Sequence, residues 1–315
     1  MKKLLLAFLL LSVVAQADDE PFKILIIADT GAASKATELQ AFIRNTPPFN
    51  RMRPEDLNIS IRTLSAQENR MNCRADASIT RNVTCDQGFL HRIQGRERAS
   101  MAVALTSSPS DYGGSGGQVP VGTINLPLQN FVHEMLHTAG LADEYPYETS
   151  DEQRRYCRGS RRKMNLAYFR DIPPYASDAA ARSTHQRDVP WMGRILASTP
   201  IINGTNLGTN IAQTEGSQQI GVYTGGPCPA DRRGRRSWIP YRDSIMRQID
   251  MADHNVYPLY EQAFIDYIQP RLGRPLRLRS RTAAERARLA ALEIDIPDPQ
   301  VQVFDPSSAS GVSQE

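Results

Sequence analysis

The stretch FVHEMLHTAGLADEY, residues 131–145, constrains the chain more than any other segment. Its histidines, His133 and His137, are four residues apart, so on a helix both imidazoles project from one face and can bind the same cation. Glu134 follows the first histidine, where its carboxylate can approach a water on that cation without being a ligand itself. The pattern therefore predicts a helix that carries a metal site and a general base, and a third ligand has to come from elsewhere.

The residues after the histidine pair offer that third ligand. Gly140 can end the helix in the left-handed conformation, which turns the chain back toward the metal. Asp143 then brings a carboxylate to the place where the ligand is needed. The spacing HExxHxxGxxD is the metzincin form of the zinc motif, with aspartate in place of the usual third histidine. We therefore expect zinc bound by His133, His137 and Asp143, with Glu134 as the catalytic general base.

A distant methionine gives an independent test of this interpretation. Metzincins also have a tight turn with a methionine beneath the zinc, and the segment RDSIMRQ, residues 242–248, offers one at Met246. Taken alone, Met246 is more often an ordinary core residue. With the extended zinc motif present, we expect the turn, in which Met246 forms an apolar floor under the ligands. Gln248 occupies the position where some metzincins have a tyrosine ligand.

The N-terminal segment predicts an exported protein. Residues 1–17, MKKLLLAFLLLSVVAQA, combine a cationic start, an apolar run and small residues, as in a signal peptide cut after Ala17. The apolar run is too short to act as a membrane span. Loss of Lys2 and Lys3 reduces the net charge from +3 to about +1, so nucleic acid is a poor partner. We expect a secreted or periplasmic protein that acts on a peptide or protein substrate.

The four cysteines indicate disulfide bonds, because an even number in an exported protein is usually paired. Three pairings are possible. We expect Cys73 to pair with Cys85, which closes a short loop, and Cys157 with Cys228, which ties down a long irregular segment. A zinc site built from these cysteines is the alternative, but no two of them have the close CxxC spacing of such sites.

Hydrophobic periodicity predicts an α/β fold with a mixed, twisted sheet. Apolar or alternating runs at 23–30, 57–63 and 101–108 are typical of strands, and Ser34 can cap a helix between the first two. The chain therefore opens as a strand-helix-strand unit with parallel strands. A short strand at 118–125 is expected at the edge of the sheet, because glycines and prolines surround it.

The remaining chain is less regular. The zinc-binding helix is expected to begin near Asn125 or Leu126, with Pro127 in its first turn. Residues 146–240 have few apolar periods, and helical patterns return at 256–273 and 282–293 with arginines between them that are typical of a solvated face. We divide the chain into a signal peptide (1–17), an N-terminal catalytic subdomain (18–140), a C-terminal subdomain with the methionine turn (141–269), and an Arg-rich helical segment with a polar tail (270–315).

Other catalytic arrangements have little support. His91, His185 and His254 lack a partner at ligand spacing and are expected at the surface.

With these motifs placed, the chain resembles the metzincin-type zinc peptidases of the immunoglobulin A peptidase family over most of residues 23–265. The segment HEMLHTAGLADEY is a highly specific marker. Four weaker markers follow the same order, namely YGGSGG (112–117), VPWMG (189–193), IGVYTGG (220–226) and SIM (244–246). The resemblance implies a metzincin-like catalytic domain with a cleft between its subdomains, bordered by the strand after the YGGSGG turn. It implies zinc-dependent peptide hydrolysis, but cleavage of immunoglobulin does not carry over.

The sequence thus predicts an exported zinc endopeptidase whose peptide substrate lies along the edge strand. Residues expected near the substrate or behind the ligands are Gly113, Gly114, Glu144 and Tyr145. One alternative is a non-catalytic secreted or envelope binding protein with a structural zinc, although such a site has no need of Glu134. Another is a zinc peptidase whose third ligand is a later glutamate, Glu148 or Glu152, but neither lies in a convincing helix.

Overall fold

A computed structural model describes residues 20–75, 82–110, 113–147, 153, 157, 162–209, 220–242, 244–247, 258–272 and 276–291. The expected signal peptide, His254 and the alternative ligands Glu148 and Glu152 lie outside the described residues. Within the described part of the chain, no helix has both the length and the hydrophobicity that crossing a membrane requires.

The protein is a mixed α/β structure built on a five-stranded sheet with the order β2-β1-β5-β7-β6. The first four strands are parallel, and β6 is antiparallel to β7. The strands predicted at 23–30, 57–63 and 101–108 are confirmed, with ends that shift by one or two residues. The strands are β1 (Phe22–Asp29), β2 (Leu57–Leu64), β5 (Met101–Thr106), β6 (Gly114–Ser115) and β7 (Val121–Thr123).

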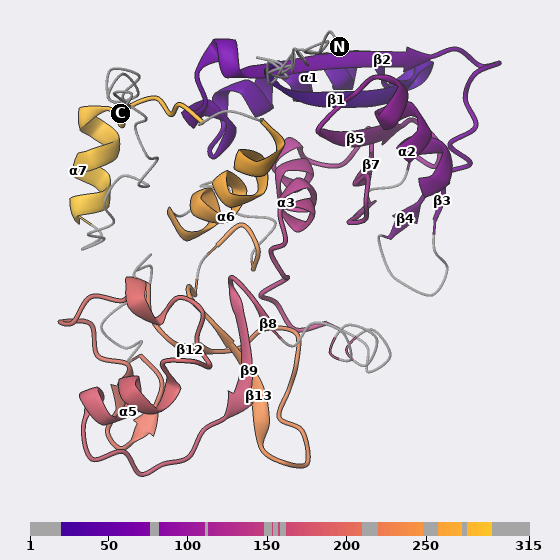
Figure 1. Cartoon of the computed structure of the whole chain (residues 1–315). Coiled ribbons are helices and arrows are strands. Elements are labelled where there is room, and N and C mark those ends of the chain that lie inside the picture. Colours follow the sequence, from indigo (N-terminus) through magenta and orange to yellow (C-terminus); the bar gives the residue numbers. More distant parts are fainter. Residues whose placement is uncertain are drawn as a thin grey trace, which may run out of the picture.

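Helices cover both faces of this sheet, which explains why β1 is buried along nearly its whole length. Alternate residues of β1, such as Ile24 and Ile26, join the larger core with α1 and α3, whereas Leu25 and Ile27 join a smaller core with α2 (Figure 1). The helices are α1 (Ala33–Asn45), α2 (Gln87–Arg96) and α3 (Leu128–Thr138).

The start of α1 differs from the prediction. Ser34 lies inside the helix and does not cap it. A short 3-10 turn, Thr30–Ala32, precedes α1, and the carboxylate of Asp29 caps that turn by accepting a hydrogen bond from the Ala32 amide at 2.9 Å. The capping function thus belongs to the last residue of β1, because the chain turns immediately after the strand.

The prediction that residues 118–125 form an edge strand is wrong. Strand β7 pairs with β5 on one side and β6 on the other, so it lies inside the sheet. A Cβ atom on Gly122 would lie 2.4 Å from the Phe131 ring of α3. The glycine is needed because α3 packs directly against the strand, and its presence does not mark a sheet edge.

Both expected disulfide bonds are present. Cys73 is bonded to Cys85, and Cys157 is bonded to Cys228. The first pair lies beside a small hairpin of β3 (Arg74–Ala75) and β4 (Val83–Thr84).

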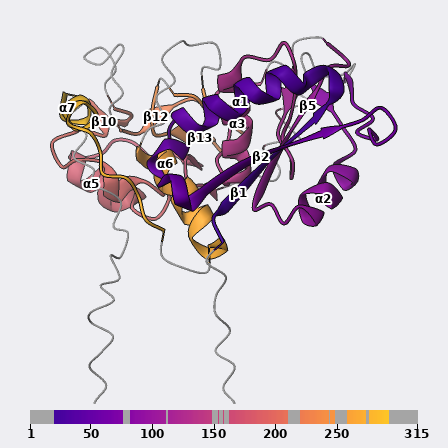
Figure 2. The same cartoon turned by 90° about the horizontal axis from the view of Figure 1, so that it is seen from above.

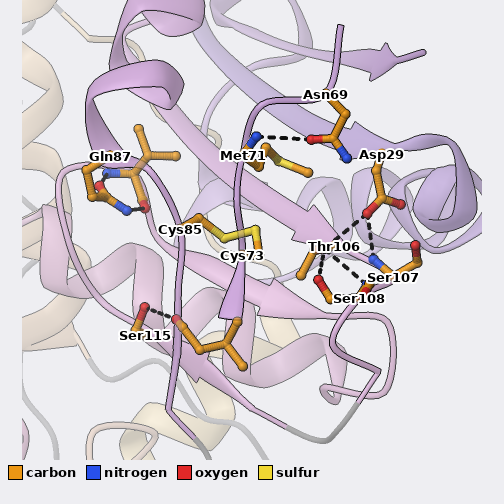
Figure 3. The surroundings of a disulfide bond; sticks show 12 residues. Asp29, Asn69, Met71, Cys73, Cys85, Gln87, Thr106, Ser107, Ser108 and Ser115 are labelled. Carbon is orange, nitrogen blue, oxygen red and sulfur yellow. Dashed lines mark hydrogen bonds between the residues drawn. A yellow bond between two sulfur atoms is a disulfide. The ribbon is translucent and has the colours of Figure 1, made fainter. Parts of the chain in front are cut away.

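This bridged loop is tied to the glycine-rich strands (Figure 3). The Ser115 hydroxyl donates a hydrogen bond to the Val83 carbonyl at 2.6 Å. The side-chain amide of Gln87 donates to the Val119 carbonyl at 2.9 Å and accepts from the Val119 amide at 3.0 Å. The hairpin beside the disulfide is thus hydrogen-bonded to β6, and the first residue of α2 is hydrogen-bonded to the segment just before β7.

The second half of the chain contains more regular structure than its composition indicates. A four-stranded antiparallel sheet has the order β12-β13-β9-β8, and its elements lie below α3 and α6 in Figure 1. The rings of Phe169 and Trp238 stack across it at 5.3 Å. The elements are β8 (Arg162–Lys163), β9 (Leu166–Arg170), α5 (Asp178–His185), β10 (Ile202–Asn203), β11 (Asn206–Leu207), β12 (Tyr223–Thr224) and β13 (Arg235–Ile239).

Helix α6 (Pro258–Ile268) returns to the first sheet. The ring of Phe264 packs edge-on against Phe22, at the start of β1, and against Phe49, with centroid distances of 6.2 and 4.6 Å. Figure 2 shows α6 beside the start of β1. The C-terminal half therefore contributes to the core of the N-terminal half, and the two predicted subdomains share one hydrophobic core.

The arginines near the C-terminus form the solvated face that the sequence indicated only in part, since Arg271 and Arg277 are exposed whereas Arg281 is largely buried. Leu278 bridges to Met52, and the segment leads into α7 (Ala283–Ala291). Three arginines of this segment pair with acids of the same chain. The ion pairs are Arg277 with Asp56 at 3.0 Å, Arg279 with Glu285 at 2.8 Å, and Arg281 with Glu261 at 2.8 Å.

Candidate metal centre

Helix α3 carries His133, Glu134 and His137 between buried apolar residues. It begins at Leu128, two or three residues later than predicted, because Pro127 has a non-helical ψ of 145° just before the first turn. Gly140 ends the motif helix with a φ of 93°, as the sequence predicted. The amide of Leu141 then bonds to the Leu136 carbonyl at 3.2 Å, so the chain reverses and runs toward Asp143.

The three predicted ligands converge. The Nε2 atoms of His133 and His137 lie 3.1 Å apart, and Oδ1 of Asp143 lies 3.1 Å from each of them. Ligands at about 2.0–2.2 Å around a tetrahedral ion are separated by roughly 3.3 Å. Among the described residues, the ligand atoms of His133, His137 and Asp143 are close enough together to share one metal ion.

Backbone carbonyls orient both imidazoles. Nδ1 of His133 lies 2.7 Å from the Ile245 carbonyl, and Nδ1 of His137 lies 3.0 Å from the Leu141 carbonyl. A carbonyl only accepts hydrogen bonds, so each Nδ1 carries the proton and the Nε2 lone pair of the neutral ring faces the centre. This tautomer is the one that a metal ion requires at this point.

Asp143 and His137 form a strongly coupled pair. Burial opposes the ionisation of Asp143, but the charges and hydrogen bonds of the two histidines outweigh burial and hold its pKa well below the usual range. Burial likewise lowers the pKa of His137, but the Asp143 carboxylate prevails and raises it to about 9. Without a metal ion, the His137 ring therefore also carries a proton on Nε2, and an ion bound at the centre would replace that proton and leave the neutral ring.

Glu134 lies beside the ligands and is not one of them. Its carboxylate oxygens would be 3.7 Å from a Cβ on Gly114 and 3.3 Å from a Cβ on Gly116, so the glycines let β6 approach the carboxylate closely. Burial raises the pKa of Glu134, although the charges of His133 and His137 oppose the rise. Gly114, which was predicted near the substrate, thus lies at the centre. Gly116 also lies there, although the sequence did not indicate it.

Gly113 has a structural role in the sheet. Its carbonyl accepts a hydrogen bond from the Thr123 amide at 3.0 Å, and the residue is buried.

Residues 244–247 form the turn that contains Met246, whose side chain is fully buried. The turn holds the ligand segment from two sides. The Ile245 carbonyl accepts from His133, as described above, and the Met246 carbonyl accepts from the Glu144 amide at 2.8 Å. The backbone of the turn therefore contacts both His133 and Glu144, which follows Asp143 in the chain.

Glu144 extends this connection. Its buried carboxylate accepts hydrogen bonds from the Ser244 hydroxyl at 2.8 Å, the Asn165 side-chain amide at 2.8 Å and the Tyr260 hydroxyl at 2.5 Å. Burial raises the pKa of Glu144 to about 7, although these hydrogen bonds lower it. Glu144, the residue after Asp143, thus connects the turn at Met246, the turn between β8 and β9, and α6.

Two tyrosines flank the centre. The Tyr145 ring stacks on His133 with a centroid distance of 6.2 Å. Tyr147, which the sequence analysis did not single out, donates a hydrogen bond from its hydroxyl to Oδ2 of Asp143 at 2.5 Å. Its position four residues after the ligand carries no motif signal, so only the folded chain reveals the contact.

His185, predicted at the surface, is buried. Its Nε2 lies 2.6 Å from the Tyr175 hydroxyl, its Nδ1 lies 3.0 Å from Oδ2 of Asp188, and its ring packs on Phe169. The correction has a simple reason, since the apolar face of α5 turns the ring into the core. His91 is exposed, as expected.

Two of the weaker sequence markers, VPWMG (189–193) and IGVYTGG (220–226), contact each other. The indole NH of Trp191 donates a hydrogen bond to the Gly221 carbonyl at 2.6 Å. Both residues are buried, so the contact is structural.

Comparison of the chain with protein-family models, with curated proteins and with solved structures gave no match. The functional argument therefore rests on the geometry of the centre and on the motifs.

Proposed function

We propose that the protein is an exported zinc-dependent endopeptidase of the metzincin type, related to the immunoglobulin A peptidase family. The observation that carries the proposal is the convergence of His133, His137 and Asp143, with the Glu134 carboxylate beside them. A purely structural site gains nothing from a carboxylate in that place.

The donor set fits zinc. Two imidazole nitrogens and one carboxylate oxygen are the usual number and kind of protein ligands in catalytic zinc sites, which leave a fourth position for water. Magnesium and calcium favour oxygen donors, so the two histidines argue against them. When bound here, zinc supplies a Lewis acid that polarises a carbonyl and lowers the pKa of a water toward about 7.

The chain itself supplies the proton transfer. Glu134 accepts a proton from the attacking water and delivers it to the leaving amine. Its half-buried position next to Gly114 and Gly116 raises its pKa, which suits a carboxylate that takes and returns a proton near neutral pH.

The substrate path shifts from the one expected, because β7 lies inside the sheet. Strand β6 is the outer strand, and its Gly114 already bridges to Asn82. We place the peptide backbone along residues 115–117, past that bridge and next to Glu134, where an extended chain can pair with main-chain groups.

A peptide-library digest with the purified full chain tests the proposal. Cleavage should disappear after treatment with a zinc chelator and return on addition of zinc. A chain that holds zinc tightly but cleaves no peptide would contradict the proposal and favour the non-catalytic alternative, in which zinc serves only to stabilise the fold.

A further inference from the structure

Tyr147 reaches the metal centre from outside the HExxHxxGxxD motif. Its hydroxyl donates a hydrogen bond to Asp143 at 2.5 Å, and the Asp143 side chain is buried whereas Tyr147 is half-buried. The backbone carbonyl of Tyr147 accepts a hydrogen bond from the side chain of Gln153 at 2.9 Å, which helps to hold the residue in place.

The two carboxylate oxygens of Asp143 have different surroundings. Oδ1 faces the centre, 3.1 Å from both histidine Nε2 atoms. Oδ2 accepts the hydrogen bond from Tyr147. A carboxylate can bind a metal ion through one oxygen or through both, and the second mode would take up space that a catalytic zinc needs for water.

We infer that Tyr147 is a positioning residue that keeps Asp143 a one-oxygen ligand and thereby reserves a coordination position for water. A phenol that donates to Oδ2 satisfies that oxygen and fixes the rotation of the carboxylate. The inference rests on the proposed zinc centre and assigns a role to a side chain outside its motif.

Tyr147→Phe is the variant that separates this role from packing. The phenyl ring keeps its edge contact with Tyr145, whose centroid lies 5.6 Å away, and only the hydroxyl is lost. Tyr267→Phe is the matched control, because that hydroxyl also donates to an acceptor, the Ser100 carbonyl, on a side of the fold that carries no ligand.

The test uses the full chain loaded with cobalt(II), whose visible absorption reports coordination number, and a chelator competition that measures zinc affinity. The native chain and Tyr267→Phe should show the intense bands of four-coordinate cobalt. Tyr147→Phe should show the weaker bands of a five-coordinate ion and a zinc affinity changed by about 10- to 100-fold. Its melting temperature, measured alongside, checks that the variant is folded.

The outcomes separate the inference from the proposed function. A Tyr147→Phe chain with the native cobalt spectrum and native zinc affinity overturns the positioning role alone. A native chain that binds neither cobalt nor zinc overturns the zinc centre and the inference with it.

Discussion

At the scale of single residues, the candidate centre depends on glycine as well as on the polar side chains, because a residue without a side chain leaves room for its neighbours. A Cβ on Gly116 would lie 3.3 Å from a carboxylate oxygen of Glu134 and 3.3 Å from the His137 ring. These distances are tighter than ordinary van der Waals contact, so an alanine there has to displace the side chain of either Glu134 or His137.

We therefore expect Gly116→Ala to reduce kcat for peptide cleavage by about tenfold or more, since small displacements of catalytic groups have large effects. The melting temperature should change little, because the residue lies at the exposed end of β6. Gly95→Ala in α2 is the control, because its Cβ would meet no atom within 4 Å. Equal activity of the two variants would show that the close approach at Gly116 has no catalytic importance.

The convergence of His133, His137 and Asp143 could be predicted from the sequence, because their spacing is local. His133 and His137 need only one helical turn, and Asp143 needs only the left-handed glycine between. Tyr147 and Gly116 could not be predicted, since their contacts with the centre depend on how a loop and a strand fold against α3.

At the scale of elements, α3 is positioned by its contact with β7. Phe131 packs where Gly122 has no side chain, so the helix lies close to the strand. We expect Gly122→Ala to destabilise the fold by about 1–3 kcal/mol, the usual cost of overpacking a core. Thermal or denaturant unfolding measures this, and adding Phe131→Leu should recover part of the loss. Unchanged stability of Gly122→Ala would contradict the proposed packing.

The elements themselves were only partly predictable. Continuous apolar runs identified β1 and β5, because a parallel strand covered on both faces is apolar throughout. The same reasoning misplaced β7 at the edge, since a glycine that accommodates a helix looks like one that disrupts a strand. The second sheet has short strands, and in the sequence they lack the length that would make a period visible.

At the scale of the whole molecule, a buried ion-pair cluster holds the C-terminal segment to the core. The carboxylate of Glu261 lies 2.6 Å from Arg51 and 2.8 Å from Arg281, and all three side chains are almost fully buried. The cluster joins α6, the segment after α1 and the segment before α7.

Glu261→Gln should cost about 3–5 kcal/mol, because it leaves buried guanidinium charges without their carboxylate. Glu68→Gln is the control, since Glu68 pairs with Arg62 at 2.6 Å at the surface, where solvent screens the pair, and its loss should destabilise the fold far less. Denaturant unfolding of both variants gives the comparison. Similar losses for the two would show that the buried cluster contributes no more than a surface pair.

The central claim is that Glu134 performs the proton transfer of a zinc-dependent peptide hydrolysis. The most direct measurement is the rate of peptide cleavage by zinc-loaded Glu134→Gln relative to the native chain, with the zinc content of both determined in parallel. We expect one zinc per chain in both proteins and cleavage slowed by about 10²–10⁴-fold in the variant. A variant that binds zinc and cleaves at the native rate would contradict the claim.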